Sequence, residues 1–128
     1  MWEFKDDRPI YLQIIEYVKL RIISGEYAPG GKLLSVRELA AEASVNPNTM
    51  QKALGELERE GLVFTRRTMG RFITEDKNMI EGIKKGLAMG HVHAFFEKMQ
   101  SMGLEKSEIL ELVTRLAEKQ QPGKEGEE

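Results

Sequence analysis

The segment that begins with Asn46 and Pro47 constrains the fold of this chain more than any other feature. Asn46 is a preferred helix N-cap, and Pro47 fits the first helical position, where its missing N–H is no loss. Apolar side chains then recur at helical spacing and predict a face turned to a core: Met50, Ala53, Leu54 and Leu57. The opposite face carries side chains that hydrogen-bond to base edges and phosphates: Asn48, Thr49, Gln51 and Lys52. The pattern indicates a helix for a DNA groove, but an ordinary amphipathic surface helix shares it, so its neighbours decide.

A second capped helix precedes this one. Ser35 and Glu38 have the spacing of a capping box, and Leu34 with Leu39 has that of a hydrophobic staple. We expect a short helix over residues 36–43 that buries four apolar positions: Val36, Leu39, Ala40 and Ala43. The connection 44–46 has the length that a helix-turn-helix requires, with Val45 filling the angle between the two helices.

The flanking segments complete a fold. An apolar stripe at helical spacing predicts a helix from Ile10 to about Ser24, before a stop at Gly25. After Gly61 the period changes to two, and Leu62, Phe64, Phe72 and Ile73 predict two short strands joined by a turn over 66–70. A helix, a helix-turn-helix and a hairpin make a winged helix, so the expected fold class is mainly α with a small β-hairpin.

The remainder predicts a two-helix tail. Asp76 is a candidate cap, a long apolar stripe follows, and Gly103 separates it from a second amphipathic helix. Glycines at every fourth position lower helix propensity by about 1 kcal/mol each, and we interpret them as a ridge for close helix packing. We expect a symmetric dimer in which the tail buries these residues: Ile80, Ile83, Gly86, Leu87, Gly90, Phe95, Leu112 and Leu116. The alternative interpretation of the glycines is a flexible helix without a partner.

The expected helices and strands set the domain limits, and the composition bears on charge and compartment. We expect a DNA-binding domain over 1–75, a dimerisation tail over 76–120 and a disordered polar tail over 121–128. The net charge is −2, but residues 61–74 carry three arginines and no acid, and 43–55 carry Lys52 and no acid. With no cysteine, no signal peptide and no apolar run of membrane-spanning length, we expect a cytoplasmic protein without disulfides or thiolate metal sites.

Rival functions are less well supported by the residues. His91 and His93 are two apart on a helix and point to different faces, so we expect no metal, no cofactor and no enzyme activity. A winged helix used only for protein contact predicts an apolar or acidic face where this chain has a polar and basic one. A small-molecule or metal effector held between the tail helices is a further alternative, with methionines and Phe95 and Phe96 as its lining.

The order of several short motifs resembles the GntR family of bacterial winged-helix regulators. The matching segments cover residues 8–76: Pro9 to Ile14, Gly31 to Leu33, Ser35 to Ala40, Val45 to Thr49, Ala53-Leu54, Leu57 to Leu62, Gly70 and Phe72-Ile73. The short tail resembles the YtrA-type subfamily, which lacks a larger effector domain and uses the tail to dimerise.

The resemblance implies roles for single residues. Ser35 and Arg37, at the start of the second helix, correspond to positions that reach DNA in the family. The recognition helix contributes Asn46, Asn48, Thr49, Gln51 and Lys52, and the wing contributes Arg66, Arg67 and Gly70. Departures are Leu34 for a proline, Gly55 for a longer side chain, and Thr68, Met69 and Arg71 in the wing. The expected function is a homodimer on a palindromic operator, with repression as the default outcome. Resemblance to the YtrA-type subfamily implies that the controlled genes include the regulator's own operon and adjacent ABC transporters.

Overall fold

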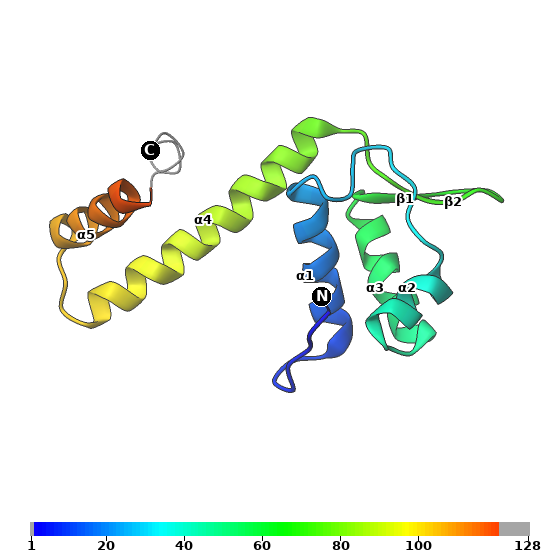
Figure 1. Cartoon of the computed structure of the whole chain (residues 1–128), viewed down its shortest axis with the longest axis horizontal. Helices are drawn as coiled ribbons and strands as arrows, with labels where there is room; N and C mark the ends of the chain where they lie inside the picture. Colours follow the sequence, from blue (N-terminus) through cyan, green and yellow to red (C-terminus); the bar gives the residue numbers. More distant parts are fainter. Residues whose placement is uncertain (1, 121–128) are drawn as a thin grey trace. The chain divides into compact units, whose positions relative to one another are not determined.

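The computed structural model describes residues 2–120, and the disorder predicted for 121–128 lies outside them. Two compact units divide between Lys84 and Lys85. The first contains three helices, a hairpin and the start of a fourth helix (Figure 1): α1 Ile10–Ile23, α2 Val36–Ala43, α3 Pro47–Arg59, β1 Val63–Arg66 and β2 Gly70–Ile73. The helix α4, Lys77–Ser101, runs into the second unit, which also contains α5, Lys106–Lys119. The predicted fold class, mainly α with a two-stranded hairpin, is confirmed.

The caps predicted from the sequence begin both helices of the helix-turn-helix. The Ser35 hydroxyl accepts a hydrogen bond from the Glu38 backbone N–H at 3.1 Å, and Glu38 Oε1 accepts one from the Ser35 N–H at 2.9 Å. Asn46 Oδ1 accepts from the Asn48 N–H at 2.7 Å, with Pro47 as the first helical residue. Each side-chain cap satisfies N–H groups that a helix start leaves without partners.

The core of the first unit lies where α3 packs against α1, α2 and β1. All four apolar positions predicted on α3 are buried, among them Met50 and Leu57 at 0% exposure. They meet Ile14 and Val18 of α1 and Leu39 of α2 in one cluster. Leu34, the other half of the expected staple, stays 48% exposed and lines a surface hollow. Because the apolar face of α3 is buried in this core, its polar face is turned outward.

The hairpin pairs antiparallel, with Phe64 opposite Phe72 and Arg66 opposite Gly70. Lys32 forms a bridge to Phe72, and the Leu33 N–H donates to the Arg71 carbonyl at 2.9 Å, so β2 is also paired on its second edge. The prediction that Leu62 and Phe64 share one face of a strand is wrong. Leu62 still belongs to the turn after α3, where its N–H bonds to the Leu57 carbonyl, and alternation starts with buried Val63. Phe64 is therefore 50% exposed.

The helix α4 begins and ends at the predicted signals, whereas α5 begins at a capping box of Glu105 and Glu108 that was not predicted. Asp76 Oδ1 accepts from the Met79 N–H at 3.1 Å, and Gly103, at φ +92°, follows the end of α4. Ile109 of α5 is fully buried, whereas other apolar side chains of the second unit are exposed: Leu87, Met89, Val92, Phe95, Met102, Leu110, Leu112, Val113 and Leu116. Within residues 2–120, no helix has the length and hydrophobicity needed to cross a membrane.

Candidate nucleic-acid interface

The turn between α2 and α3 fixes the angle of the helix-turn-helix. Ser44 adopts the left-handed conformation at φ +58°, and the Val45 N–H returns to the Ala40 carbonyl at 2.9 Å. Val45 packs against the core, as predicted. These contacts end α2 and start α3 within the 3 residues between them, and the first two residues of α3, Pro47 and Asn48, are exposed.

The candidate contacts on α3 fall into two groups. Asn48 and Gln51 are exposed, and Thr49 is half-buried beside them. Asn46 is exposed but its side-chain oxygen is used in the N-cap. The Lys52 ammonium lies 3.8 Å from the centroid of the Tyr11 ring on α1, a cation–π contact that holds its side chain toward α1. Asn48 and Gln51 are thus exposed amides on the outer face of α3 that neither the N-cap nor the cation–π contact engages.

The start of α2 adds one cation and one engaged hydroxyl. Arg37 is exposed in the first turn, whereas Ser35 is bound in the capping box. The Ser35 backbone N–H, its hydroxyl and the nearby Lys32 charge lower the pKa of Glu38 below its usual 4.5. Glu38 is therefore a carboxylate at neutral pH, and the Ser35 hydroxyl is occupied in holding the start of α2.

The wing presents its predicted cations in different ways. Arg67 is exposed in the turn between the strands, but the Arg66 guanidinium lies 4.8 Å from the centroid of the Phe72 ring. Thr68 has φ +62° and Gly70 φ +109°, so the turn uses left-handed backbone at both positions. A Cβ added at Gly70 would lie only 3.2 Å from Lys32 Cε, so this position favours a residue without a side chain.

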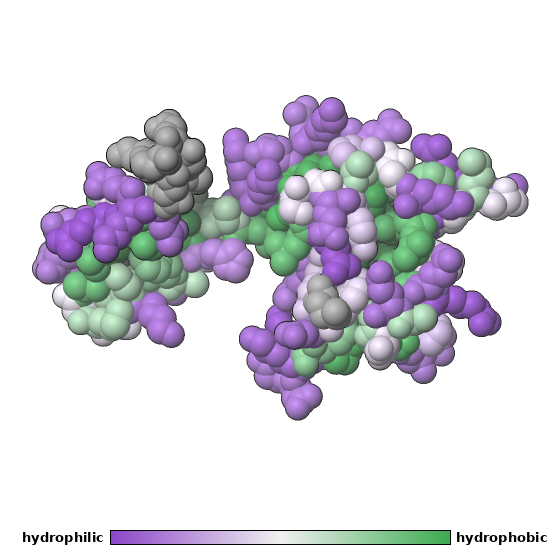
Figure 2. Space-filling model, in the orientation of Figure 1, coloured by the Kyte–Doolittle hydropathy of each residue, from purple (hydrophilic) through white to green (hydrophobic). Residues whose placement is uncertain are grey.

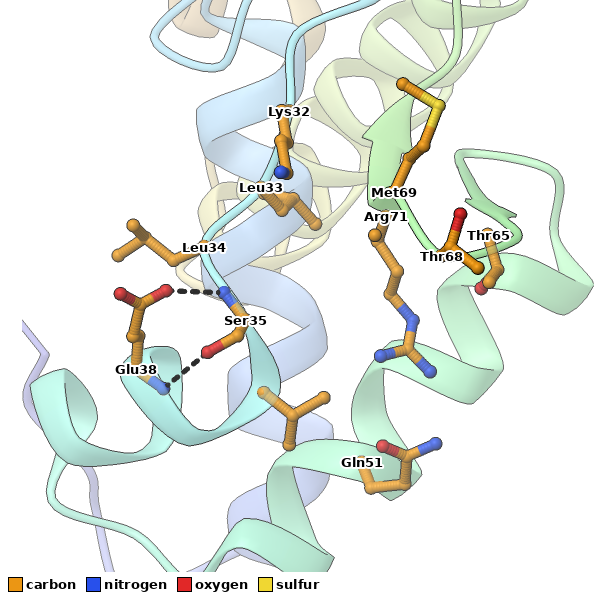
Figure 3. A pocket seen from close by; sticks show the side chains of 12 residues that line it. Lys32, Leu33, Leu34, Ser35, Glu38, Gln51, Thr65, Thr68, Met69 and Arg71 are labelled. Atoms are coloured by element: carbon orange, nitrogen blue, oxygen red, sulfur yellow. Dashed lines mark hydrogen bonds between the residues drawn. The ribbon is translucent and has the colours of Figure 1, made fainter.

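A hollow of about 740 Å³ joins the three candidate elements on one face. Its lining includes Ser35 and Glu38 at the start of α2, Gln51 of α3, and five hairpin residues (Figure 3): Thr65, Thr68, Met69, Gly70 and Arg71. The predicted wing cations Arg66 and Arg67 do not line it. Arg71, a departure from the family pattern in the wing, lines this hollow. Its guanidinium extends from β2 toward Gln51 and pairs with Glu58 of α3 at 3.5 Å. Sequence reasoning missed this inward direction, because strand alternation gives a face but not a partner.

The predicted dimerisation residues divide between the two units. Ile80 is only 8% exposed and Ile83 packs beside it on the core of the first unit, so their hydrophobicity is explained without a second copy. Leu87, Phe95, Leu112 and Leu116 are 37–57% exposed, and hydrophobic side chains reach the surface of the second unit in Figure 2. At Gly86 and Gly90 an added Cβ meets nothing within 4 Å in the described part of the chain.

Comparison with known proteins places this fold in a family. Residues 10–73 match the family model described as bacterial regulatory proteins, gntR family. The uncharacterized HTH-type transcriptional regulator YhcF of Bacillus subtilis (strain 168) is 40% identical over 116 residues, which are 91% of this chain and 96% of YhcF. The chain belongs to the GntR family. This GntR regulator is also 46% identical over 80 residues to the HTH-type transcriptional repressor YtrA of the same organism, 61% of this chain and 62% of YtrA.

Solved structures agree with that placement. A GntR family transcriptional regulator from Listeria monocytogenes superposes with a TM-score of 0.83 at 41% identity, covering 88% of this chain and 98% of its own. The DNA-binding domain of AraR in complex with operator ORX1 matches with a TM-score of 0.54 at 26% identity, covering 58% of this chain and 95% of its own. The resemblance predicted from the sequence is confirmed, and this GntR regulator is a DNA-binding transcription regulator.

Proposed function

We propose that this regulator binds a palindromic operator as a homodimer and represses the promoter that contains it. One observation carries the proposal: the start of α2, the outer face of α3 and the hairpin meet around a single hollow on one face. In a winged helix this arrangement lets α3 enter a major groove while the hairpin touches the adjacent backbone and minor groove. The AraR operator complex supports the same use of the matched domain.

The contacts of this proposal follow from exposure and chemistry. Asn48 and Gln51 are amides that suit adenine, and Thr49 suits a phosphate or a base edge. Arg37 and Arg67 are exposed cations that suit phosphates or a narrow minor groove. Ser35, Asn46, Lys52, Arg66 and Gly70 complete the surface through caps, ring stacking and the close turn. A polar and cationic face of this kind favours DNA over a protein partner.

Homodimerisation is proposed from the second unit. Its exposed leucines and phenylalanine need burial, and the open space at Gly86 and Gly90 leaves room for a second helix to approach closely. A second copy provides the same chemistry and makes a symmetric contact. A symmetric dimer requires half-sites related by a two-fold axis, with centres about 34 Å apart along the duplex. Since bacterial operators lie in the cytoplasm, the proposal also places the protein there.

Repression is the expected outcome of binding, because a dimer seated on a promoter excludes polymerase. The name of the relative YtrA, a transcriptional repressor, supports this direction. The DNA to test first is the promoter fragment upstream of the protein's own gene. It would be labelled and titrated with the full chain at two salt concentrations, with random competitor DNA present.

We expect nanomolar binding that survives competitor and weakens as salt rises. Inserting about 5 base pairs between the half-sites should abolish the high-affinity complex, because half a helical turn moves them to opposite faces of the duplex. A second titration uses genomic fragments enriched by their binding to the protein. The proposal would be contradicted if the protein bound the promoter fragment, these genomic fragments and random DNA with equal affinity. That outcome would favour a winged helix used for protein contact, or a regulator that needs an effector bound to its tail.

A further inference from the structure

An ion pair joins the hairpin to the recognition helix inside the hollow. The Arg71 Nη2 donates to Glu58 Oε1 at 3.5 Å, and the Thr65 hydroxyl donates to the other oxygen of the same carboxylate. Arg71 and Glu58 side chains are 17% and 28% exposed, so both are largely removed from water. Glu58 of α3 therefore binds one side chain from each strand of the hairpin.

The arginine of this pair is poorly satisfied. A guanidinium has five N–H donors, and its bonds to carboxylates and phosphates are strongest at about 2.7–2.9 Å. The contact to Glu58 is longer than that and uses one nitrogen. The buried Nε has no hydrogen-bond acceptor within the described residues. A buried donor without a partner is costly, so an acceptor that enters the hollow gains a contact which the free protein does not supply.

The position of the hollow identifies that acceptor. It lies between α3, which suits the major groove, and the hairpin, which suits the minor groove. In duplex DNA the sugar-phosphate backbone separates the two grooves, so a backbone segment must pass between elements that enter adjacent grooves. Arg71 extends from β2 toward Gln51 across this gap (Figure 3). A phosphate there meets a planar fork with free donors.

We propose that Arg71 is a DNA phosphate contact, retained by Glu58 in the free protein and released to the backbone between α3 and the wing on operator binding. The inference rests on the proposed DNA-binding face. Glu58 then competes with DNA for the same guanidinium. Removing the competitor strengthens operator binding, whereas removing the arginine weakens it.

The test compares Arg71→Gln, Glu58→Gln and the double variant in operator titrations over a range of salt concentrations. The matched controls are Arg59→Gln and Glu56→Gln, which form an i,i+3 ion pair on α3 that does not include the hairpin. Arg59→Gln changes the net charge by the same amount as Arg71→Gln, and Glu56→Gln by the same amount as Glu58→Gln. Thermal unfolding of each full-length variant reports whether the fold is kept.

We expect Arg71→Gln to weaken operator binding about 5- to 50-fold and to lower the slope of log affinity against log salt by about 1 per half-site, about 2 for the dimer, relative to Arg59→Gln. Glu58→Gln should bind more tightly than Glu56→Gln, and this gain should vanish when Arg71 is also replaced. The Glu58→Gln arm decides the question even if Arg71→Gln does not fold.

A different pattern would overturn the inference. If the pair only fastens the wing, Arg71→Gln and Glu58→Gln both weaken binding and leave the salt slope at the control value. Specific operator binding by the unchanged protein, with these results, would reject the phosphate contact alone. Absence of specific operator binding by the unchanged protein would instead reject the proposed function itself.

Discussion

Single side chains on the candidate interface differ in how much of their bonding capacity is already used. Ser35 and Asn46 are engaged in caps, and Lys52 is held against Tyr11. Asn48 and Gln51 remain exposed on the same helix. Base discrimination comes from side chains that place donors and acceptors against base edges, so we expect these two amides to carry most of it.

Replacing Gln51 by Ala tests this distinction at one residue. We expect Gln51→Ala to lose about 1–3 kcal/mol of preference at one base pair of each half-site. Arg37→Ala should instead weaken binding to all operator variants alike and lower the salt slope by about 1 per half-site, about 2 for the dimer. Titration of a set of single-base operator variants measures both. Lys106→Ala, a cation at the start of α5, is the control, and an unchanged base preference in Gln51→Ala would reject the assignment.

At the scale of elements, α2 depends on its capping box. The helix is 8 residues long, and isolated helices of this length are unstable in water. Ser35→Ala removes the side-chain acceptor for the Glu38 N–H, and we expect the free energy of unfolding to fall by about 1 kcal/mol. Chemical denaturation measures the change. Ser107→Ala in α5 should leave stability nearly unchanged, and equal stability of the two variants would contradict the role of the cap.

The Glu38 carboxylate links this cap to pH. Its pKa is lowered in the folded protein by the Ser35 backbone N–H, the Ser35 hydroxyl and the Lys32 charge. A carboxyl whose pKa falls on folding favours the folded state above its unfolded pKa, and this contribution is lost as pH falls through the folded pKa. Glu38→Gln should therefore flatten the loss of stability below about pH 4.5, the group's usual pKa. Denaturation from pH 6 to about 3 measures it, with Glu118→Gln expected to follow the unchanged protein.

Local signals accounted for most element boundaries, because they act within a few residues. The capping box at Ser35, Pro47 after Asn46, and Gly103 all mark real helix ends. Long-range packing decided what they could not. Periodicity placed Ile80 and Ile83 on the same stripe as Leu87, but only tertiary contacts reveal that the first two face the core of the first unit. The direction of the long Arg71 side chain likewise depends on Glu58, which is distant in sequence.

At the scale of the whole molecule, the exposed apolar surface of the second unit predicts self-association. Leu116→Glu places a charge at a residue that is 57% exposed, and we expect it to shift the dimer toward monomer at micromolar concentration. Leu20→Glu on α1 is the matched control, since Leu20 is 56% exposed but lies outside the proposed interface. Light scattering measures the mass of both. A monomeric mass for the unchanged protein, or equal masses for the two variants, would contradict the dimer.

The pairing of β2 on both edges has a consequence for how such a regulator diversifies. The root of the hairpin is fixed by Lys32 and Leu33 on one side and by β1 on the other, whereas the turn residues Arg67, Thr68 and Met69 are exposed. Substitutions at exposed sites rarely change stability by more than about 0.5 kcal/mol. Arg67 and Met69 are therefore open to mutation without loss of the fold. A lineage carrying this protein is free to acquire new operator preferences at these positions while the rest of the chain stays under selection for stability.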